Sequence, residues 1–289
     1  RMSKAHGVLL VDKPTGWTSH DVVAKLRGIL GERRIGHAGT LDPMATGLLV
    51  VAVGPCTRLL QFATAAEKTY SGTVRFGVAT DSLDADGVEV MRAPVPDLTV
   101  DRVNAVAHTF LGEGSQVPPM VSALKVNGTK LYELARDGHV IERAPRPVTV
   151  HSFEVVAGEG TDWHFTVSVS AGTYVRVLAA DLAERLGTVG HLTVLRRLAS
   201  GTSQVSDALT LDRIAELKAA ALRPASFLVN HLPAHDVDDD EVRALRHGKQ
   251  VECRGGADRV VALSHGEVVA ILERRDTRYQ PIVVLPTDS

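Results

Sequence analysis

The chain of 289 residues has few of the features that disulfide-bonded, metal-binding or membrane-spanning proteins require. Its two cysteines, Cys56 and Cys253, lie far apart, and no grouping of cysteine and histidine has the spacing of a zinc or iron–sulfur site. No stretch approaches the roughly 18 apolar residues of a membrane-spanning helix, and the first residues do not follow a signal-peptide pattern. The sequence therefore predicts a cytoplasmic protein with no bound metal and no membrane partner.

The chain also lacks the glycine-rich motifs that bind nucleotide phosphates. No G-x-G-x-x-G motif opens a βαβ unit and there is no Walker A sequence, so we expect no nucleotide cofactor. The formal net charge is −2, which does not suit a protein that binds polyanions with its whole surface. The charge is uneven, because residues 1–60 hold eight Lys and Arg against four Asp and Glu, whereas residues 206–241 hold three against eight. A nucleic-acid site has to come from this uneven distribution.

The chain does contain the mixture of helical and alternating periodicities that is typical of an α+β protein. Helical spacing predicts helices over 19–30, 100–111, 174–186, 211–221 and 240–247. Apolar runs and alternation predict strands over 8–11, 48–53, 70–76, 148–156, 163–170 and 192–198. We expect a mixed, largely antiparallel sheet with flanking helices in a first domain, residues 1–230. A small β-rich domain, residues 234–289, should add three strands near 260–263, 268–273 and 282–285.

The stretch Gly36–Gly47 carries the residues best suited to chemistry. Its three glycines and one proline predict a loop without helix or strand, and the apolar run Leu48–Val53 anchors that loop to a buried strand. The loop brings a carboxylate, Asp42, and an imidazole, His37, to a strand end, where catalytic groups commonly lie. Spacing alone favours a simpler interpretation in which Asp42 only caps a turn, because Asp-Pro favours turn initiation.

Six segments, in chain order, share a pattern with a known family. They are residues 9–21, 36–47, 68–70, 81–87, 116–125 and 172–176, which read LLVDKPTGWTSHD, GHAGTLDPMATG, KTY, DSLDADG, QVPPMVSALK and GTYVR. On these segments the chain resembles the bacterial tRNA pseudouridine synthases of the B family, which isomerise uridine 55 in the T-arm of tRNA. The resemblance extends over most of the predicted first domain, and it favours a catalytic Asp42 over a turn cap.

The resemblance implies a role for the residues at matching positions. Asp42 corresponds to the family's aspartate nucleophile, and Arg176 to the arginine that pairs with it. Tyr70 corresponds to the tyrosine that stacks against the target base, and His37 to the histidine near the space that the base vacates. Extruding a base from the RNA stack costs a few kcal/mol of free energy. Stacking of the extruded base on an aromatic face offsets about 1–3 kcal/mol of that cost.

Further matching positions are assigned to substrate binding. Lys13 belongs, with Pro14, to the motif that supports the active-site loop. Tyr174 lies in the segment that ends at Arg176. Leu195 falls at a leucine position that contacts the target base, although Val194 and Leu198 in the same strand compete for that assignment.

Residues 115–147 form a long, polar and irregular segment, which resembles an RNA-binding, thumb-like insertion that closes over the T-arm. Its basic residues, with Tyr132 among them, are Lys125, Lys130, Arg136, Arg143 and Arg146. Lys125 is assigned to substrate binding, because irregular basic segments near an RNA site can follow phosphates. The alternative is a surface loop whose charges are incidental.

Residues 234–289 resemble the family's small PUA-like RNA-binding domain by position and size, and not by a strong motif. Basic residues that could meet the RNA backbone there are Arg243, Arg246, His247, Lys249 and Arg254. Ordinary surface charge explains them equally well.

The implied reaction breaks the C1′–N1 bond of uridine, forms a C1′–C5 bond and needs no cofactor. Asp42 attacks C1′ of the ribose or C6 of the base, or a glycal forms, and the sequence does not separate these routes. The expected partner is tRNA, with no obligate protein partner. One alternative is a guide-dependent synthase of the dyskerin type, and another is a non-catalytic RNA-binding protein or chaperone. A glycosidase needs paired acids, and Asp42 has no second acid within its own motif.

Overall fold

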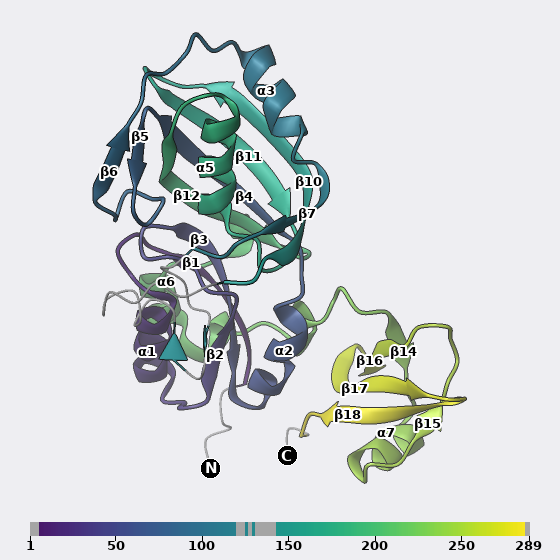
Figure 1. Cartoon of the computed structure of the whole chain (residues 1–289). Helices are drawn as coiled ribbons and strands as arrows, with labels where there is room; N and C mark the ends of the chain where they lie inside the picture. The colour runs from purple at the N-terminus through teal and green to yellow at the C-terminus, as the bar shows by residue number, and fades with distance from the viewer. Residues whose placement is uncertain (1–5, 120–124, 127–128, 131–142, 287–289) are drawn as a thin grey trace. The chain divides into compact units, whose positions relative to one another are not determined.

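The computed structural model of the chain describes residues 6–119, 125–126, 129–130 and 143–286 (Figure 1). The chain divides into two compact units, each of which mixes helices and strands. One unit consists of Arg1–Leu41, Leu48–Ala66 and Ser200–Ser289, and the other of Asp42–Gly47 and Glu67–Ala199. The α+β class predicted from the sequence is confirmed. Within the described ranges, no helix has the length and apolar character that crossing a membrane requires.

Strand β3 (Thr46–Val53) is central to the first unit, where it neighbours β1 (Gly7–Lys13) and pairs antiparallel with β2 (Ile35–Ala38). Helix α1 (Ser19–Leu30) follows β1 and begins as predicted, because the Thr18 and Asp21 side chains form a reciprocal capping box. The helix ends at Gly31, which adopts a left-handed conformation with φ +65°. Apolar side chains three and four positions apart on α1 are buried, which holds the helix on the core.

Two elements of the first unit differ from the prediction. The predicted loop from Gly36 is a strand as far as Ala38, so His37 lies on β2. Gly36 lies within this strand without interrupting it. A Cβ at Gly36 would lie 2.7 Å from Leu60 Cδ1, so the absence of a side chain leaves room for Leu60 to pack against the strand. The helix predicted over 211–221 is α6 (Leu211–Leu217), which ends where the next residue takes a positive φ and a 3-10 turn follows.

The second unit is built on a sheet whose strands are mostly antiparallel. Its order is β12 (Gly190–Ser200), β4 (Lys68–Phe76), β11 (Asp162–Val169), β10 (Arg146–Ala157) and β7 (Gly112–Gln116). The ladders β4–β11, β11–β10 and β10–β7 are all antiparallel, which confirms the predicted pairing of the alternating segments. Thr46 and Gly47, the first residues of β3, pair in parallel with Arg196 and Arg197 of β12. The turn that carries Asp42 is therefore tied directly to this sheet.

Two helices pack on the sheet of the second unit (Figure 1). Helix α5 (Val175–Arg185) lies across one face and buries Leu178, Ala179, Leu182 and Ala183. Helix α3 (Val100–His108) runs beside β10, where the Asn104 side chain bonds both the N–H and the carbonyl of Val155. A short hairpin that the sequence did not predict, β5 (Val78–Thr80) and β6 (Glu89–Arg92), encloses the turn over Asp81–Gly87.

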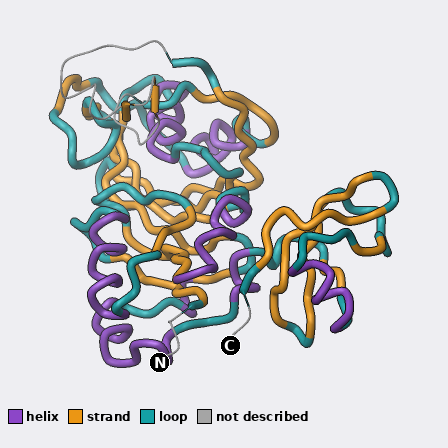
Figure 2. The backbone as a smooth tube through the Cα atoms, turned by 90° about the horizontal axis from the view of Figure 1, so that it is seen from below, coloured by secondary structure: helices purple, strands orange, loops and turns teal. Residues whose placement is uncertain are grey.

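The C-terminal segment of the first unit forms a five-stranded sheet with one helix, α7 (Asp239–Arg246) (Figure 2). The sheet order is β14 (Ala234–Asp236), β16 (Arg259–Ser264), β17 (Glu267–Arg275), β18 (Arg278–Val284) and β15 (Val251–Glu252). The three predicted strands are confirmed as β16, β17 and β18. The two further strands, β14 and β15, were not predicted, because they are too short for an alternating pattern to show. Apolar side chains from β16, β17 and β18 share one buried cluster with Leu48, Phe62 and Ala63.

Candidate active site

Asp42 occupies the first position of a tight turn between β2 and β3. The Ala45 N–H donates to the Asp42 carbonyl at 3.0 Å, and Pro43 takes the second position, as its fixed φ favours in turns of this kind. The Asp42 side chain keeps about a third of its surface exposed, 34%. The carboxylate therefore stands on a constrained turn and is reachable from solvent.

Arg176, at the start of α5, binds this carboxylate through two nitrogen atoms of its guanidinium. Its Nε lies 2.9 Å from Asp42 Oδ2, and its Nη2 donates to Asp42 Oδ1 at 3.2 Å. The third guanidinium nitrogen, Nη1, donates to the Ser82 carbonyl at 2.9 Å. Arg176 is only 3% exposed, so the cation of the pair is shielded from solvent while the carboxylate remains partly open. A planar fork of this kind fixes a carboxylate in one orientation.

A second carboxylate, Asp84, approaches the same guanidinium. Its Oδ2 lies 3.6 Å from Arg176 Nη1, and its side chain is almost fully buried. The turn over Asp81–Gly87 holds it there, because Asp84 Oδ1 accepts from the Ser82 hydroxyl at 2.6 Å and from the Asp86 N–H at 3.1 Å. We did not predict a role for Asp84 from the sequence, although its segment is one of the six that carry the family resemblance.

The charges around Asp42 act in opposite directions. Burial raises the pKa of the Asp42 carboxyl above its usual range, the Arg176 guanidinium acts to lower it, and the negative charges of Asp84 and Asp86 raise it further. The guanidinium of Arg176 thus lies close to two carboxylates, those of Asp42 and Asp84. Arg176 is the group that favours the ionised form of Asp42, which a nucleophile needs.

Tyr70 lies on β4, 7% exposed, with its hydroxyl against another buried cation. Arg197 Nη1 donates to Tyr70 Oη at 3.4 Å from the neighbouring strand β12, and Arg197 is only 1% exposed. Lys68 precedes Tyr70 by two residues and is also buried. Burial and the nearby charge of Arg197 lower the pKa of Lys68 to about 8. The sequence prediction missed Arg197, because a lone arginine in a strand is usually at the surface.

Leu195 and Arg197 lie two residues apart on β12 and are both buried, whereas Val194, directly before Leu195, is 53% exposed. Alternation therefore directs Leu195 and Arg197 to the same face of the sheet and Val194 to the other.

Tyr174 caps the N-terminus of α5 with extended backbone. The Gln116 side chain holds that backbone from both sides, because its Oε1 accepts from the Tyr174 N–H at 2.9 Å and its Nε2 donates to the Tyr174 carbonyl at 3.3 Å. The start of the helix that carries Arg176 is thereby attached to the end of β7.

Two further candidate residues, Lys13 and His37, belong to the first unit. Lys13 is fully buried, and its ammonium donates to the Pro14 carbonyl at 2.9 Å and to the Trp17 carbonyl at 2.5 Å, so it stabilises the turn before α1. His37 on β2 packs edge to face against His20, with ring centroids 5.7 Å apart. Asp42 and Arg176, by contrast, belong to the second unit.

The insertion is described in part. Lys125 lies in β8 (Lys125–Val126), which pairs antiparallel with β9 (Thr129–Lys130), and the Arg143 guanidinium donates to the Pro118 carbonyl at 2.7 Å. Tyr132 and Arg136 lie outside the described residues, as do the side chains of Lys125 and Lys130.

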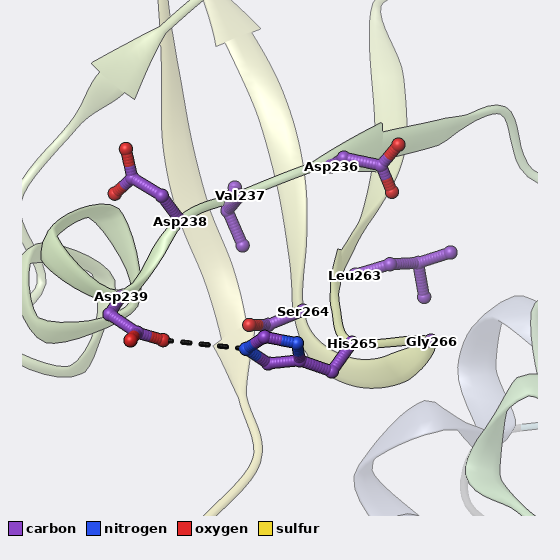
Figure 3. Close-up of a pocket in the computed structure, with 8 residues that line it drawn as sticks. All are labelled: Asp236, Val237, Asp238, Asp239, Leu263, Ser264, His265 and Gly266. Atoms are coloured by element: carbon purple, nitrogen blue, oxygen red, sulfur yellow. Dashed lines mark ion pairs between the residues drawn. The ribbon is translucent and has the colours of Figure 1, made fainter.

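A pocket in the C-terminal sheet is acidic (Figure 3). Its lining is Asp236, Val237, Asp238, Asp239, Leu263, Ser264, His265 and Gly266. His265 Nε2 lies 3.7 Å from Asp239 Oδ1, but both side chains are exposed, so the pair contributes little. Three carboxylates make this edge unfavourable for phosphate. Across the described ranges, no group of three or more His, Cys, Asp and Glu side chains is arranged to hold a metal ion.

Two family models match parts of the chain, and curated proteins are similar over most of its length. A family model described as TruB family pseudouridylate synthase, N terminal domain, matches residues 27–175, and one described as tRNA Pseudouridine synthase II, C terminal, matches residues 232–286. The chain is 43% identical to tRNA pseudouridine synthase B of Thermobifida fusca over 97% of this chain and 98% of that protein. It is 45% identical to the Lactococcus lactis subsp. lactis protein of the same name, over 85% and 78%.

Solved structures are similar over nearly the whole chain. The crystal structure of a Cbf5-Nop10-Gar1 complex matches with a TM-score of 0.77 and 28% identity, covering 99% of this chain and 85% of that chain. A structure of an H/ACA RNP bound to a substrate RNA containing 2'-deoxyuridine matches with a TM-score of 0.75 and 26% identity, covering 100% and 86%.

Proposed function

Because the chain belongs to the TruB family of pseudouridylate synthases, we propose that it isomerises uridine to pseudouridine in tRNA, at position 55 of the T-arm. Asp42 acts as the nucleophile, and Arg176 keeps it ionised and oriented. The relatives named tRNA pseudouridine synthase B support tRNA as the substrate, since their similarity extends over almost the full length of both chains.

The observation that carries the proposal is the two-pronged pairing of Asp42 with Arg176 on a turn whose carboxylate is partly open to solvent. A protein that only binds RNA gains nothing from a carboxylate placed where a polyanion approaches. Placing that carboxylate there costs free energy, because both ions of the pair lose water, and removing one member of a buried pair leaves the other uncompensated, which commonly destabilises a protein by about 3–5 kcal/mol. An oriented, charge-supported carboxylate is what nucleophilic attack requires.

The reaction rearranges bonds within one nucleoside. The C1′–N1 bond breaks, a C1′–C5 bond forms, C5 loses its proton and N1 gains one, so no redox partner or transferred group is needed. The target uridine leaves the RNA stack first, at a cost of a few kcal/mol. The aromatic face of Tyr70 returns part of that cost by stacking, and Leu195 and Tyr174 contribute further contacts to the base.

The remaining assignments concern the rest of the RNA. His37 fills space that the base vacates, Lys13 keeps the turn after β1 in shape, and Lys125 in the insertion contacts phosphate. We further propose that residues 1–230 form the catalytic domain and that residues 234–289 form an RNA-binding domain. The start of the second family model at residue 232 supports this division. Cys56 and Cys253 are free thiols, which suits a cytoplasmic enzyme.

A guide-dependent synthase is the second candidate, because the similar structures include a Cbf5-Nop10-Gar1 complex and an H/ACA RNP with substrate RNA. Sequence identity distinguishes the tRNA enzyme from the guide-dependent synthase. The chain is 43% identical to a protein named as a tRNA enzyme and 28% identical to the Cbf5 chain. The stand-alone tRNA enzyme is therefore the better supported of the two.

The test is to incubate the purified protein with an unmodified tRNA transcript, without guide RNA or cofactor, and to map pseudouridine by chemical treatment and primer-extension stops. A transcript in which uridine 55 is replaced by cytidine is the matched control. A single stop at position 55, absent from the control, is the expected result. No stop in any tRNA would contradict the proposal, and a stop that appears only with a guide RNA and partner proteins would favour the second candidate.

A further inference from the structure

Arg197 is among the largest side chains in the protein that are fully buried. An arginine is seldom buried completely unless its donors are satisfied, because its charge cannot be removed by deprotonation inside a protein. Its position on β12 is also closely constrained. A Cβ at Gly47 would lie 2.3 Å from the Arg197 carbonyl oxygen and 2.8 Å from its nitrogen, so the end of the Asp42 turn packs directly on the Arg197 backbone.

The side chain of Arg197 extends to Tyr70. Its Nη1 lies 3.4 Å from the phenolic oxygen, and its Cζ lies over the ring, 6.0 Å from the ring centroid. Arg197 therefore joins two parts of the site, since its backbone supports the Asp42 turn and its side chain reaches the proposed stacking residue.

The chemistry of the two groups sets the direction of this hydrogen bond. A guanidinium has only donors, so the Tyr70 oxygen must act as the acceptor. The guanidinium therefore holds the phenolic oxygen in place, and with it the direction of the Tyr70 ring.

We infer that Arg197 is a positioning residue for Tyr70: its hydrogen bond to the phenolic oxygen fixes the ring in the orientation in which it stacks on the extruded uracil. This inference rests on the proposed function of the site. Arg197 acts through Tyr70 and does not touch the substrate.

The test is a double-mutant cycle with Arg197→Met and Tyr70→Phe. Single-turnover rates of pseudouridine formation and dissociation constants for a T-arm stem-loop are measured for each variant. We expect Arg197→Met to slow turnover about tenfold or more with an unchanged dissociation constant, since a hydrogen bond to a charged group is lost. In the Tyr70→Phe background the same change should slow turnover no further. Arg197→Lys, which keeps a donor, should recover part of the rate.

Arg75→Met is the matched control, because Arg75 lies on β4 with Tyr70 but pairs at the surface with Asp162. Thermal melting shows whether each variant folds, and if Arg197→Met does not fold, Arg197→Lys replaces it in the cycle. Additive slowing in the double variant, or an effect on RNA affinity alone, would overturn the inference.

A second readout does not depend on catalysis. In protein with ¹³C-labelled tyrosine, the Tyr70 Cζ resonance, assigned with Tyr70→Phe, should shift in Arg197→Met and Arg197→Lys but not in Arg75→Met. An unmoved resonance would contradict the contact itself. A protein that forms no pseudouridine but shows the shift would refute the proposed function while keeping the Arg197–Tyr70 contact.

Discussion

Arg176 holds Asp42 by two parallel contacts, with Nε 2.9 Å from Oδ2 and Nη2 3.2 Å from Oδ1. The same guanidinium bonds the Ser82 carbonyl and lies 3.6 Å from the buried carboxylate of Asp84. The orientation and the charge of Asp42 thus depend on residues from three distant parts of the sequence.

Replacing Arg176 with lysine keeps a positive charge but removes the fork. We expect Arg176→Lys to lower the single-turnover rate by about a hundredfold or more, because two charge-assisted hydrogen bonds of about 1.5–3 kcal/mol each are replaced by one flexible contact. Affinity for tRNA should stay unchanged. The control is Arg185→Lys on the same helix, whose guanidinium bonds Thr109 at the surface. A rate close to that of the unchanged protein would contradict the role of the fork.

Asp84 is one of the groups that raise the pKa of Asp42. Its charge raises the pKa of Asp42, so Asp84→Asn should lower that pKa and move the acid limb of the rate–pH profile to lower pH. Asp86→Asn should move the limb in the same direction by less, since Asp86 makes the smaller contribution. The rate is followed from neutral to acid pH while circular dichroism confirms the fold. A limb displaced to higher pH in Asp84→Asn would show that Asp84 does not act on Asp42 in this way.

Gly47 has to be glycine for two reasons, a φ of +99° and the close approach to the Arg197 backbone. Gly47→Ala should therefore lower the free energy of unfolding by more than the roughly 1–3 kcal/mol of backbone strain alone. Gly112→Ala isolates the strain, because Gly112 has a φ of +93° and open space around its Cβ position. Both variants are unfolded in urea. Equal losses would mean that the contact with Arg197 adds nothing.

The C-terminal segment is best tested by charge and not by truncation. Its strands share a buried apolar cluster with residues of β3 and α2 (Leu60–Ala63), so deleting it would expose part of the first unit's core. Reversing Arg246 and Lys249 together should weaken tRNA binding and reduce the salt slope by about two, one for each lost phosphate contact. The control is Arg275→Glu in the same sheet, where the arginine pairs with Glu273. An unchanged slope would make the segment structural.

The sequence predicted the long elements well and the short ones poorly. The caps of α1 and the alternation over 148–156 and 163–170 are local signals, and the structure confirms them. Strand β2 was missed because glycine was taken as a strand breaker, whereas Gly36 makes room for Leu60. Asp84 and Arg197 could not be assigned from the sequence, since their contacts join residues that are 92 and 127 positions apart. Such pairings exist only once the sheet has formed.

The most direct measurement is the activity of Asp42→Asn on a tRNA transcript under single-turnover conditions, with binding measured in parallel. The amide keeps the size of the side chain and removes the charge and the nucleophile, so pseudouridine at position 55 should fall below detection while the dissociation constant for tRNA stays unchanged. Thermal melting checks that the variant remains folded. Substantial pseudouridine formation by folded Asp42→Asn would contradict the assignment of Asp42 as the nucleophile.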